Sequence, residues 1–284
     1  MDRRDFIAVG DVMIDVSVEG DALEHGGHVT GKVRIAPGGS AANAAAWARA
    51  DGASAAVVGR VGDDVAGAVL RTALEERGID ALLAADDETP TGAVLTLGDT
   101  IVAERGANAR FVPADVPAAL EAGAVLVSGY ALLQPDTGAA AVAALERAAA
   151  EWVAVDAASA RLLDRFGREP FFAATGAATA LLLNEDEAYA LTDDEPGGAA
   201  RALGDLYRLV CVKGGPAGAL AVLDGEPFEA PAPEVEVVAA AGAGDAFAGA
   251  LFAALTRERP FNEALAEAVR AGSAAAASAA NWPD

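Results

Sequence analysis

Short, almost purely apolar runs alternate along this chain with longer stretches rich in alanine. Seven of the apolar runs have the length and the branched residues of strands, at 6–9, 55–58, 125–127, 153–155, 180–183, 209–212 and 219–223. The alanine-rich stretches predict helices at 41–50, 66–77, 139–150 and 246–256. Apolar strands that alternate with helices indicate a parallel sheet buried on both faces, so the expected fold class is a three-layer α/β/α domain.

Two segments depart from this alternation. Residues 12–35 and 91–105 have strand character without intervening helices, and they carry Gly, Asp and Thr at positions typical of turns. We expect them to form a small antiparallel sheet inserted into the main unit. Because the sequence shows no internal repeat and no long linker, residues 1–284 are expected to form one domain.

Composition and charge narrow the classes of partner. The chain has 284 residues, of which 53% are hydrophobic, which is enough for one large α/β domain with a sizeable core. Its formal net charge is −23, and such a surface repels nucleic acids and anionic membranes. A site for an anion would have to draw its positive potential from backbone N–H groups, helix N-termini or a metal ion.

The single cysteine and the N-terminal residues bear on the compartment. Cys211 has no partner within the chain, so no intrachain disulfide can form, as is usual in a reducing compartment. The first residues lead directly into a strand-like run without the features of a signal peptide, and no apolar stretch has the length of a membrane span. We therefore expect a cytoplasmic protein with no membrane partner.

The strongest chemical signal is the string Gly242-Ala243-Gly244-Asp245. A strand-like approach at 237–238 precedes it, and a helix with an apolar face follows. Glycines let the backbone approach a ligand closely and leave the first N–H groups of the helix free to bind an anion. Asp245 would lie in the first helical turn, where it can remain ionised and accept a hydroxyl proton. The alternative is an ordinary aspartate at a helix start.

A second glycine pair, Gly38-Gly39, opens another helix and is followed by Asn43 among alanines. A buried amide needs hydrogen-bond partners. Asn43 either caps local backbone or faces a ligand rich in hydroxyls.

Two further motifs follow predicted strands. Asn184 and Glu187 come directly after the strand at 180–183, at the end where open α/β sheets bind ligands, and their oxygens suit water-mediated Mg²⁺ binding. Alternatively they belong to a solvated acidic helix start. Lys213, Gly215 and Gly218 form a glycine-rich turn that could wrap a nucleotide or simply connect two strands.

Other motifs can be set aside. Residues 26–33 nearly spell a phosphate-binding loop, but Val33 replaces the required Ser or Thr and no helix follows. His25 and His28 lack partners with the spacing of a metal site. Phe247 stands where a dinucleotide fingerprint needs its third glycine.

Taken in order, these motifs resemble the ribokinase-like, or PfkB, family of carbohydrate and nucleoside kinases. The resemblance covers nearly the whole chain, from Asp11 and Asp15 through the motif at 58–64 to a helix at 271–280. It implies a Rossmann-like α/β domain with a small β-sheet lid, here the segments 12–35 and 91–105. It also implies ATP as phosphate donor, Mg²⁺ as metal, and a sugar-like small molecule as substrate.

The family assigns roles to the matching positions. Asp245 looks like the catalytic base, and Gly242, Ala243 and Gly244 look like the anion hole for the transferring phosphoryl group. The positions that match substrate-binding residues are Asp15, Gly38, Gly39 and Asn43. Asp11 is a nearby candidate, and Asn108 belongs to a segment that resembles the Gly-Ala-Asn lid segment of sugar kinases. Those that match nucleotide-binding residues are Asn184, Lys213, Gly215 and Gly218, and Glu187 matches the residue that organises Mg²⁺. Ser273 stands where a helix asparagine often approaches adenine, so it is the candidate for the base-binding edge.

The chain also departs from the family pattern. Ala239-Ala240 replaces an Asp-Thr pair whose aspartate helps to hold potassium, which argues against activation by a monovalent cation. Met13 replaces the sugar-contacting asparagine of ribokinases proper, which argues against ribose. Arg105 either contacts an acidic or phosphorylated substrate or pairs with Glu104, and we expect the second.

The leading functional hypothesis is therefore a sugar kinase. A nucleoside kinase is the alternative within the fold, although the lid segments lack aromatic residues that could stack on a base and Tyr130 is the one candidate near the cleft. A non-catalytic sugar or nucleotide sensor is the alternative from another class, but a sensor has no need of a base. Exposed lid strands tend to pair, so a homodimer through the lid is compatible with the sequence.

Overall fold

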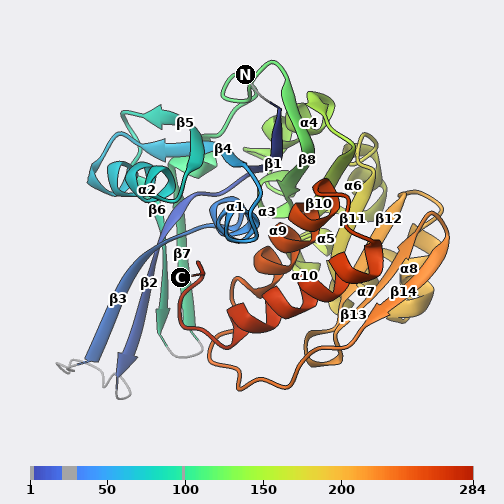
Figure 1. Cartoon of the computed structure of the whole chain (residues 1–284). Helices are drawn as coiled ribbons and strands as arrows, with labels where there is room; N and C mark the ends of the chain where they lie inside the picture. The colour runs from blue at the N-terminus through green and yellow to red at the C-terminus, as the bar shows by residue number, and fades with distance from the viewer. Residues whose placement is uncertain (1–2, 21–30, 98–99, 284) are drawn as a thin grey trace.

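A ten-stranded mixed sheet forms the centre of the computed structural model, which describes residues 3–20, 31–97 and 100–283 (Figure 1). The strand order is β14-β13-β12-β11-β10-β8-β1-β4-β5, and β9 pairs with β8. The strands are β1 (Arg4–Val9), β4 (Ala55–Gly62), β5 (Ile79–Asp86), β8 (Leu120–Ser128), β9 (Ala148–Ala149), β10 (Trp152–Asp156), β11 (Ala180–Asn184), β12 (Leu209–Lys213), β13 (Ala219–Leu223) and β14 (Glu226–Ala230). All seven expected strands are present.

We had expected a parallel sheet, but two of the strand pairs are antiparallel. β13 pairs antiparallel with β12, and β14 pairs antiparallel with β13. The reason is the length of the connections, because only 214–218 and 224–225 separate these strands. A parallel crossover needs a dozen residues or more.

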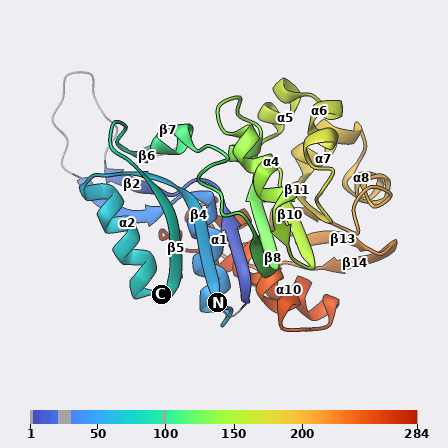
Figure 2. The ribbon, with the colours of Figure 1, turned by 90° about the horizontal axis from the view of Figure 1, so that it is seen from above.

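Helices cover both faces of the sheet, as Figure 2 shows from above. One face packs against α1 (Ser40–Ala50), α2 (Val65–Glu76), α9 (Ala243–Thr256) and α10 (Phe261–Ala276). The other packs against α3 (Gly129–Leu132), α4 (Gly138–Glu146), α5 (Ala160–Phe166), α6 (Arg168–Ala174), α7 (Glu185–Thr192) and α8 (Pro196–Leu203). Side chains of β1 alternate between the two layers, with Phe6 in one core and Ile7 in the other. The expected three-layer fold is confirmed.

Two expected helices end earlier in the structure, and one expected strand is absent. The helix expected at 139–150 ends at Glu146, and the one expected at 271–280 is the last part of α10, which ends at Ala276. The approach at 237–238 is a loop, and both of its valines are 58% exposed. Pro231 and Pro233 precede this loop, and proline cannot donate the hydrogen bonds that a further strand would need.

A separate four-stranded sheet arises from the two segments that had strand character. Its order is β3-β2-β6-β7, formed by β2 (Met13–Gly20), β3 (Gly31–Gly38), β6 (Thr91–Leu97) and β7 (Thr100–Gly106). The sheet is mixed rather than antiparallel, because β2 and β6 come from different hairpins and pair in parallel. The motif at 26–33 lies mostly outside the described residues, as do His25 and His28.

A close helix contact brings the two glycine motifs together. α1 and α9 cross at Gly249, where an added Cβ would clash with the backbone oxygen of Ala44. Small residues at this crossing let the start of α1 approach the start of α9, so the two chemical motifs meet although about 200 residues separate them.

We expect Gly249→Ala to separate these helices. Overpacking should lower the free energy of unfolding by about 1–3 kcal/mol, measured by denaturant unfolding. Gly197→Ala is the matched control, since the nearest atom to its added Cβ, on Arg201, lies 3.8 Å away in α8. Equal stability of both variants would contradict the prediction.

Cys211 is fully buried in β12, and burial raises the pKa of its thiol to about 12. Among the residues that the structure describes, every helix is too short or too polar to cross a membrane.

Candidate active site

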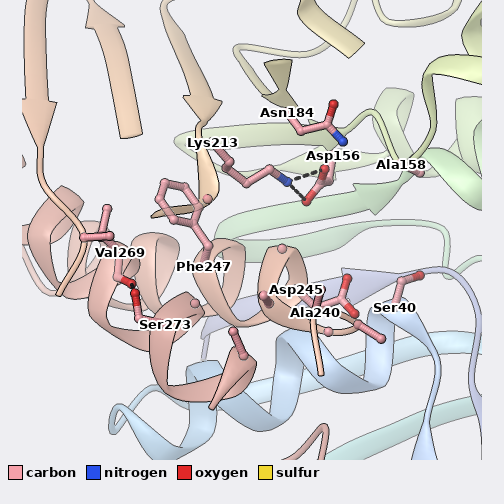
Figure 3. A pocket seen from close by; sticks show the side chains of 18 of the residues that line it. Ser40, Asp156, Ala158, Asn184, Lys213, Ala240, Asp245, Phe247, Val269 and Ser273 are labelled. Atoms are coloured by element: carbon pink, nitrogen blue, oxygen red, sulfur yellow. Dashed lines mark hydrogen bonds and ion pairs between the residues drawn. The ribbon is translucent and has the colours of Figure 1, made fainter. Parts of the chain in front are cut away.

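A pocket of about 880 Å³ lies where parallel strands of the large sheet end (Figure 3). The carboxyl ends of β10, β11 and β12 carry Asp156, Asn184 and Lys213, and all three side chains line it. Gly242, Ala243, Gly244 and Asp245 line it from the start of α9. Its volume falls in the range of small-molecule sites, and its place is the one expected for open α/β sheets.

The glycine-rich turn places Asp245 as the sequence predicts. Gly242 is the N-cap of α9 and has a φ of 80°, a conformation that favours glycine, so the helix starts abruptly at Ala243. Asp245 lies in the first turn, and its Oδ2 accepts a hydrogen bond of 2.9 Å from Nδ2 of Asn43. The alternative that Asn43 caps local backbone is wrong, because its amide contacts this carboxylate and the indole of Trp282. Its role in substrate binding stays a prediction.

The environment of Asp245 makes it a stronger base than an ordinary aspartate. Burial and the negative charges of Asp156 and Asp15 raise its pKa to about 7, against the lowering effects of the Asn43 hydrogen bond and Lys213. A carboxylate with a pKa near neutrality can take a proton from an alcohol more readily than one that titrates near 4.

Lys213 faces Asp156 in the pocket (Figure 3). Its Nζ donates to both carboxylate oxygens at 2.8 Å. Burial alone would lower the pKa of Lys213, but the charges of Asp156, Glu187 and Asp245 outweigh it and raise that pKa. The ammonium group is therefore charged, and it lies beside Gly244, whose added Cβ would stand 3.2 Å from Nζ.

Sequence reasoning missed Asp156. The available signal was its position, immediately after the strand expected at 153–155 and thus at the ligand-binding edge of the sheet.

Asn184 and Glu187 form a capping box at the start of α7. The amide oxygen of Asn184 accepts from the backbone of Glu187, and the Glu187 carboxylate accepts from both the backbone and the amide of Asn184, each at 2.8 Å. Glu187 is only 2% exposed, so it is not a solvated residue of the helix start, whereas its neighbours Glu185 and Asp186 are exposed. Burial raises its pKa to about 7, although Lys213 opposes this.

These groups suit a phosphate-bound Mg²⁺ better than a protein-held one. No group of three or more metal-ligating side chains occurs among the described residues. Glu187 lines the pocket with a buried carboxylate, as a hard-oxygen partner for a hydrated cation requires. Glu187, together with phosphate oxygens and water, could therefore hold Mg²⁺.

The turn after β12 and the helix α10 also line the pocket. Gly215 and Gly218, both at positive φ, lie there with Ser273. The Ser273 hydroxyl donates to the backbone oxygen of Val269 at 2.9 Å within its own helix. The nucleotide-binding roles of these residues stay predictions.

The predicted acceptor positions lie beyond the pocket, around the start of α1. Asp15 lies over Gly38, and Gly39 packs on the backbone of Asp11, so side chains at these glycines would clash. Asp15 accepts a hydrogen bond from Asn281, a residue that sequence reasoning missed. The structure thus brings these positions beside Asn43 and Asp245.

Asn108 lies among backbone groups. Its oxygen accepts from the N–H of Val12 at 2.9 Å, and its nitrogen donates to the carbonyls of Val12 and Arg105 at 3.0 and 3.1 Å. Asn108 therefore links the start of β2 to the end of β7. Its role in substrate binding stays a prediction.

The expected pairing of Arg105 with Glu104 is wrong. Neighbouring residues in a strand point to opposite faces, and Arg105 instead pairs with Asp11 at 2.8 Å. Glu104 accepts from the backbone N–H of Gly106.

Comparison with known proteins agrees with this geometry. The family model described as pfkB family carbohydrate kinase matches residues 3–281. The chain belongs to this family. It is accordingly a phosphotransferase that acts on a hydroxyl group of a small molecule.

Three similar proteins illustrate the range of this pfkB family. The chain is 30% identical to the aminoimidazole riboside kinase of Salmonella typhimurium over 261 residues, covering 86% of this chain and 81% of that protein. It is 32% identical to the ATP-dependent ribose-1-phosphate kinase of Halopiger xanaduensis over 255 residues, covering 87% and 83%. An E. coli protein described as a ribokinase II, in complex with ATP and Mg²⁺, matches with a TM-score of 0.87 at 21% identity, covering 98% and 94%.

Proposed function

We propose that this kinase transfers the γ-phosphate of ATP to a hydroxyl of a sugar or sugar-derived molecule, with Asp245 as general base. The observation that carries the proposal is the position of the Asp245 carboxylate. It lies in the first turn of a helix, is held by Asn43 from the acceptor side, and borders the same pocket as Lys213. One carboxylate thus lies between a place for the alcohol and a place for the phosphates.

Each group in the pocket has a distinct task in this reaction. Asp245 takes the proton of the attacking hydroxyl, and the N–H groups at the start of α9 stabilise the charge on the transferring phosphoryl group. Lys213, held by Asp156, contributes a positive charge next to Gly244. Mg²⁺, bound with the phosphates near Glu187, would neutralise further negative charge.

The four-stranded sheet would act as a lid over the acceptor. The base of this sheet, near Asp11 and Arg105, adjoins the acceptor positions, so closure would exclude water from the reacting groups.

The single reduced cysteine agrees with a cytoplasmic location.

The test is ATP turnover with a panel of acceptors. We would measure ADP release with ribose, other sugars, polyols, aminoimidazole riboside, adenosine and ribose 1-phosphate. At least one should support turnover that depends on both ATP and Mg²⁺. Turnover with none of them would count against the proposed substrate class.

One observation favours a phosphorylated acceptor as a second candidate. Arg105 places a guanidinium group at the root of the lid, and that group is a natural partner for a phosphate. The Halopiger relative acts on ribose 1-phosphate.

For a nucleoside acceptor, Tyr130 is the candidate that could stack on the base, since this side chain lines the pocket and is 44% exposed.

The activity should require a pH high enough to ionise Asp245. Because its pKa is raised to about 7, kcat/KM should fall tenfold per pH unit below this value. A pH–rate profile at saturating Mg²⁺ checks this. A profile that stays flat from pH 5 to 8 would contradict the assignment of the base.

A further inference from the structure

The last residues of the chain lie against the acceptor positions. After α10 ends at Ala276, the segment 277–283 returns to α1 and to the root of β2. Here the Asn281 amide donates to Asp15 Oδ2, and the Trp282 indole N–H donates to Asn43 Oδ1 at 3.0 Å. Sequence reasoning assigned no role to either residue.

Several contacts hold this segment in place. The indole N–H of Trp47, in α1, donates to the backbone oxygen of Asn281 at 2.9 Å. Arg77, at the end of α2, lies over the Trp282 ring at 5.3 Å and donates to the backbone oxygen of Pro283. Trp282 is only 6% exposed, so its ring is part of the core rather than a loose end.

The hydrogen bonds fix which way the Asn43 amide points. An indole N–H can only donate, so the Asn43 atom that faces Trp282 must be the oxygen. A carboxylate can only accept, so the atom that faces Asp245 must be the NH₂ group. Without the indole donor, the amide could rotate and turn its oxygen toward the carboxylate.

We propose that Trp282 is a positioning residue for the phosphoryl transfer, which sets the orientation of Asn43 and through it holds Asp245 in place for the acceptor hydroxyl. This inference rests on the proposed function. It extends the acceptor site to the C-terminal segment, about 240 residues away in sequence from the helix start that it completes.

Other charged groups also affect the pKa of Asp245. They are Asp15 from β2, Asp156 from β10 and Lys213 from β12, while Tyr130 at the start of α3 and Glu187 in α7 border the same pocket. The Trp282 ring itself contacts Asn43 and Arg77 rather than any of these groups. Asn43 lowers the pKa of Asp245, so loss of its correct orientation should raise that pKa further.

The variant Trp282→Phe tests the inference, because it keeps an aromatic ring under Arg77 but removes the N–H donor together with part of the indole. We expect kcat to fall roughly tenfold with an unchanged KM for ATP, because the misoriented amide would lose the hydrogen bond from Asn43 to the Asp245 carboxylate. The acidic limb of the pH–rate profile should move to higher pH. Trp152→Phe is the matched control, since Trp152 is also buried beneath an arginine, Arg208, but lies in β10 at the end remote from Asp156.

A double-mutant cycle separates positioning from a purely structural effect. If Trp282 acts through Asn43, Trp282→Phe should cause no further loss of kcat in an Asn43→Ala background. The same fold loss in both backgrounds, or an unshifted acidic limb, would overturn the inference. Failure of the proposed function would look different, because the wild-type protein itself would then phosphorylate no acceptor.

Discussion

Replacing Asp245 by asparagine is expected to lower kcat by roughly 10²- to 10⁴-fold, the usual contribution of a general base. The amide keeps the size of the side chain but cannot take a proton from the acceptor hydroxyl. ATP affinity should change little, because the N–H groups of α9 and the Lys213 ammonium remain. Steady-state kinetics and a direct ATP-binding measurement together check both expectations.

The control for this variant is Asp205→Asn, which removes an exposed carboxylate outside the pocket. Asp205→Asn should retain wild-type kcat. Wild-type turnover in Asp245→Asn would show that another group accepts the proton, and the proposed mechanism would then be wrong.

The substitution Asp245→Asn should also change how the free energy of unfolding depends on pH. The pKa of Asp245 is about 7 in the folded protein and near 3.8 when unfolded, so its favourable contribution is complete below pH 3.8 and is lost as the pH rises through 7. Asparagine carries no charge at any pH. The melting temperature of Asp245→Asn should therefore exceed that of the wild type increasingly between pH 4 and 7.

The variant Lys213→Met should have the second largest effect. It leaves the carboxylates of Asp156 and Glu187 without their shared cation, at a place where negatively charged phosphates must bind. We expect kcat/KM for ATP to fall about 10- to 100-fold, as for the loss of a hydrogen bond between charged groups. Because Lys213 also lowers the pKa of Asp245, the acidic limb of the pH profile should move upward.

The chain offers a direct control for this change. Lys32 is its only other lysine and is exposed on β3. Lys32→Met makes the same change in charge and should leave kcat/KM for ATP unaltered. An equal loss in both variants would indicate a general electrostatic effect rather than a local contact with phosphate.

Local patterns sufficed to predict the α/β layers and much of the site. Apolar runs gave the strands, and the motifs at Gly242 and Asn184 were expected at strand or helix ends. Strands and helix starts of this kind depend mainly on residues that are close in sequence. The glycine conformation that starts α9 and the capping box of α7 are two examples. The resemblance to the pfkB family then supplied the order of the motifs.

Contacts between distant segments could not be predicted in this way. The pair of Asp156 and Lys213 depends on β11 lying between β10 and β12, which no local pattern specifies. The bond from Trp282 to Asn43 depends on the path of the chain after α10. The pairing of Arg105 was predicted incorrectly because strand alternation was not applied to its immediate neighbour.

The deep burial of Cys211 has a practical consequence for testing whether the four-stranded sheet moves as a lid. Thiol-directed dyes react with the thiolate at accessible positions, and this side chain offers neither the ionised form nor access at neutral pH. A cysteine introduced at exposed Ile35 on β3 would then be the sole labelling position in an otherwise unmodified protein. Fluorescence from such a label could report opening and closing of the four-stranded sheet during turnover.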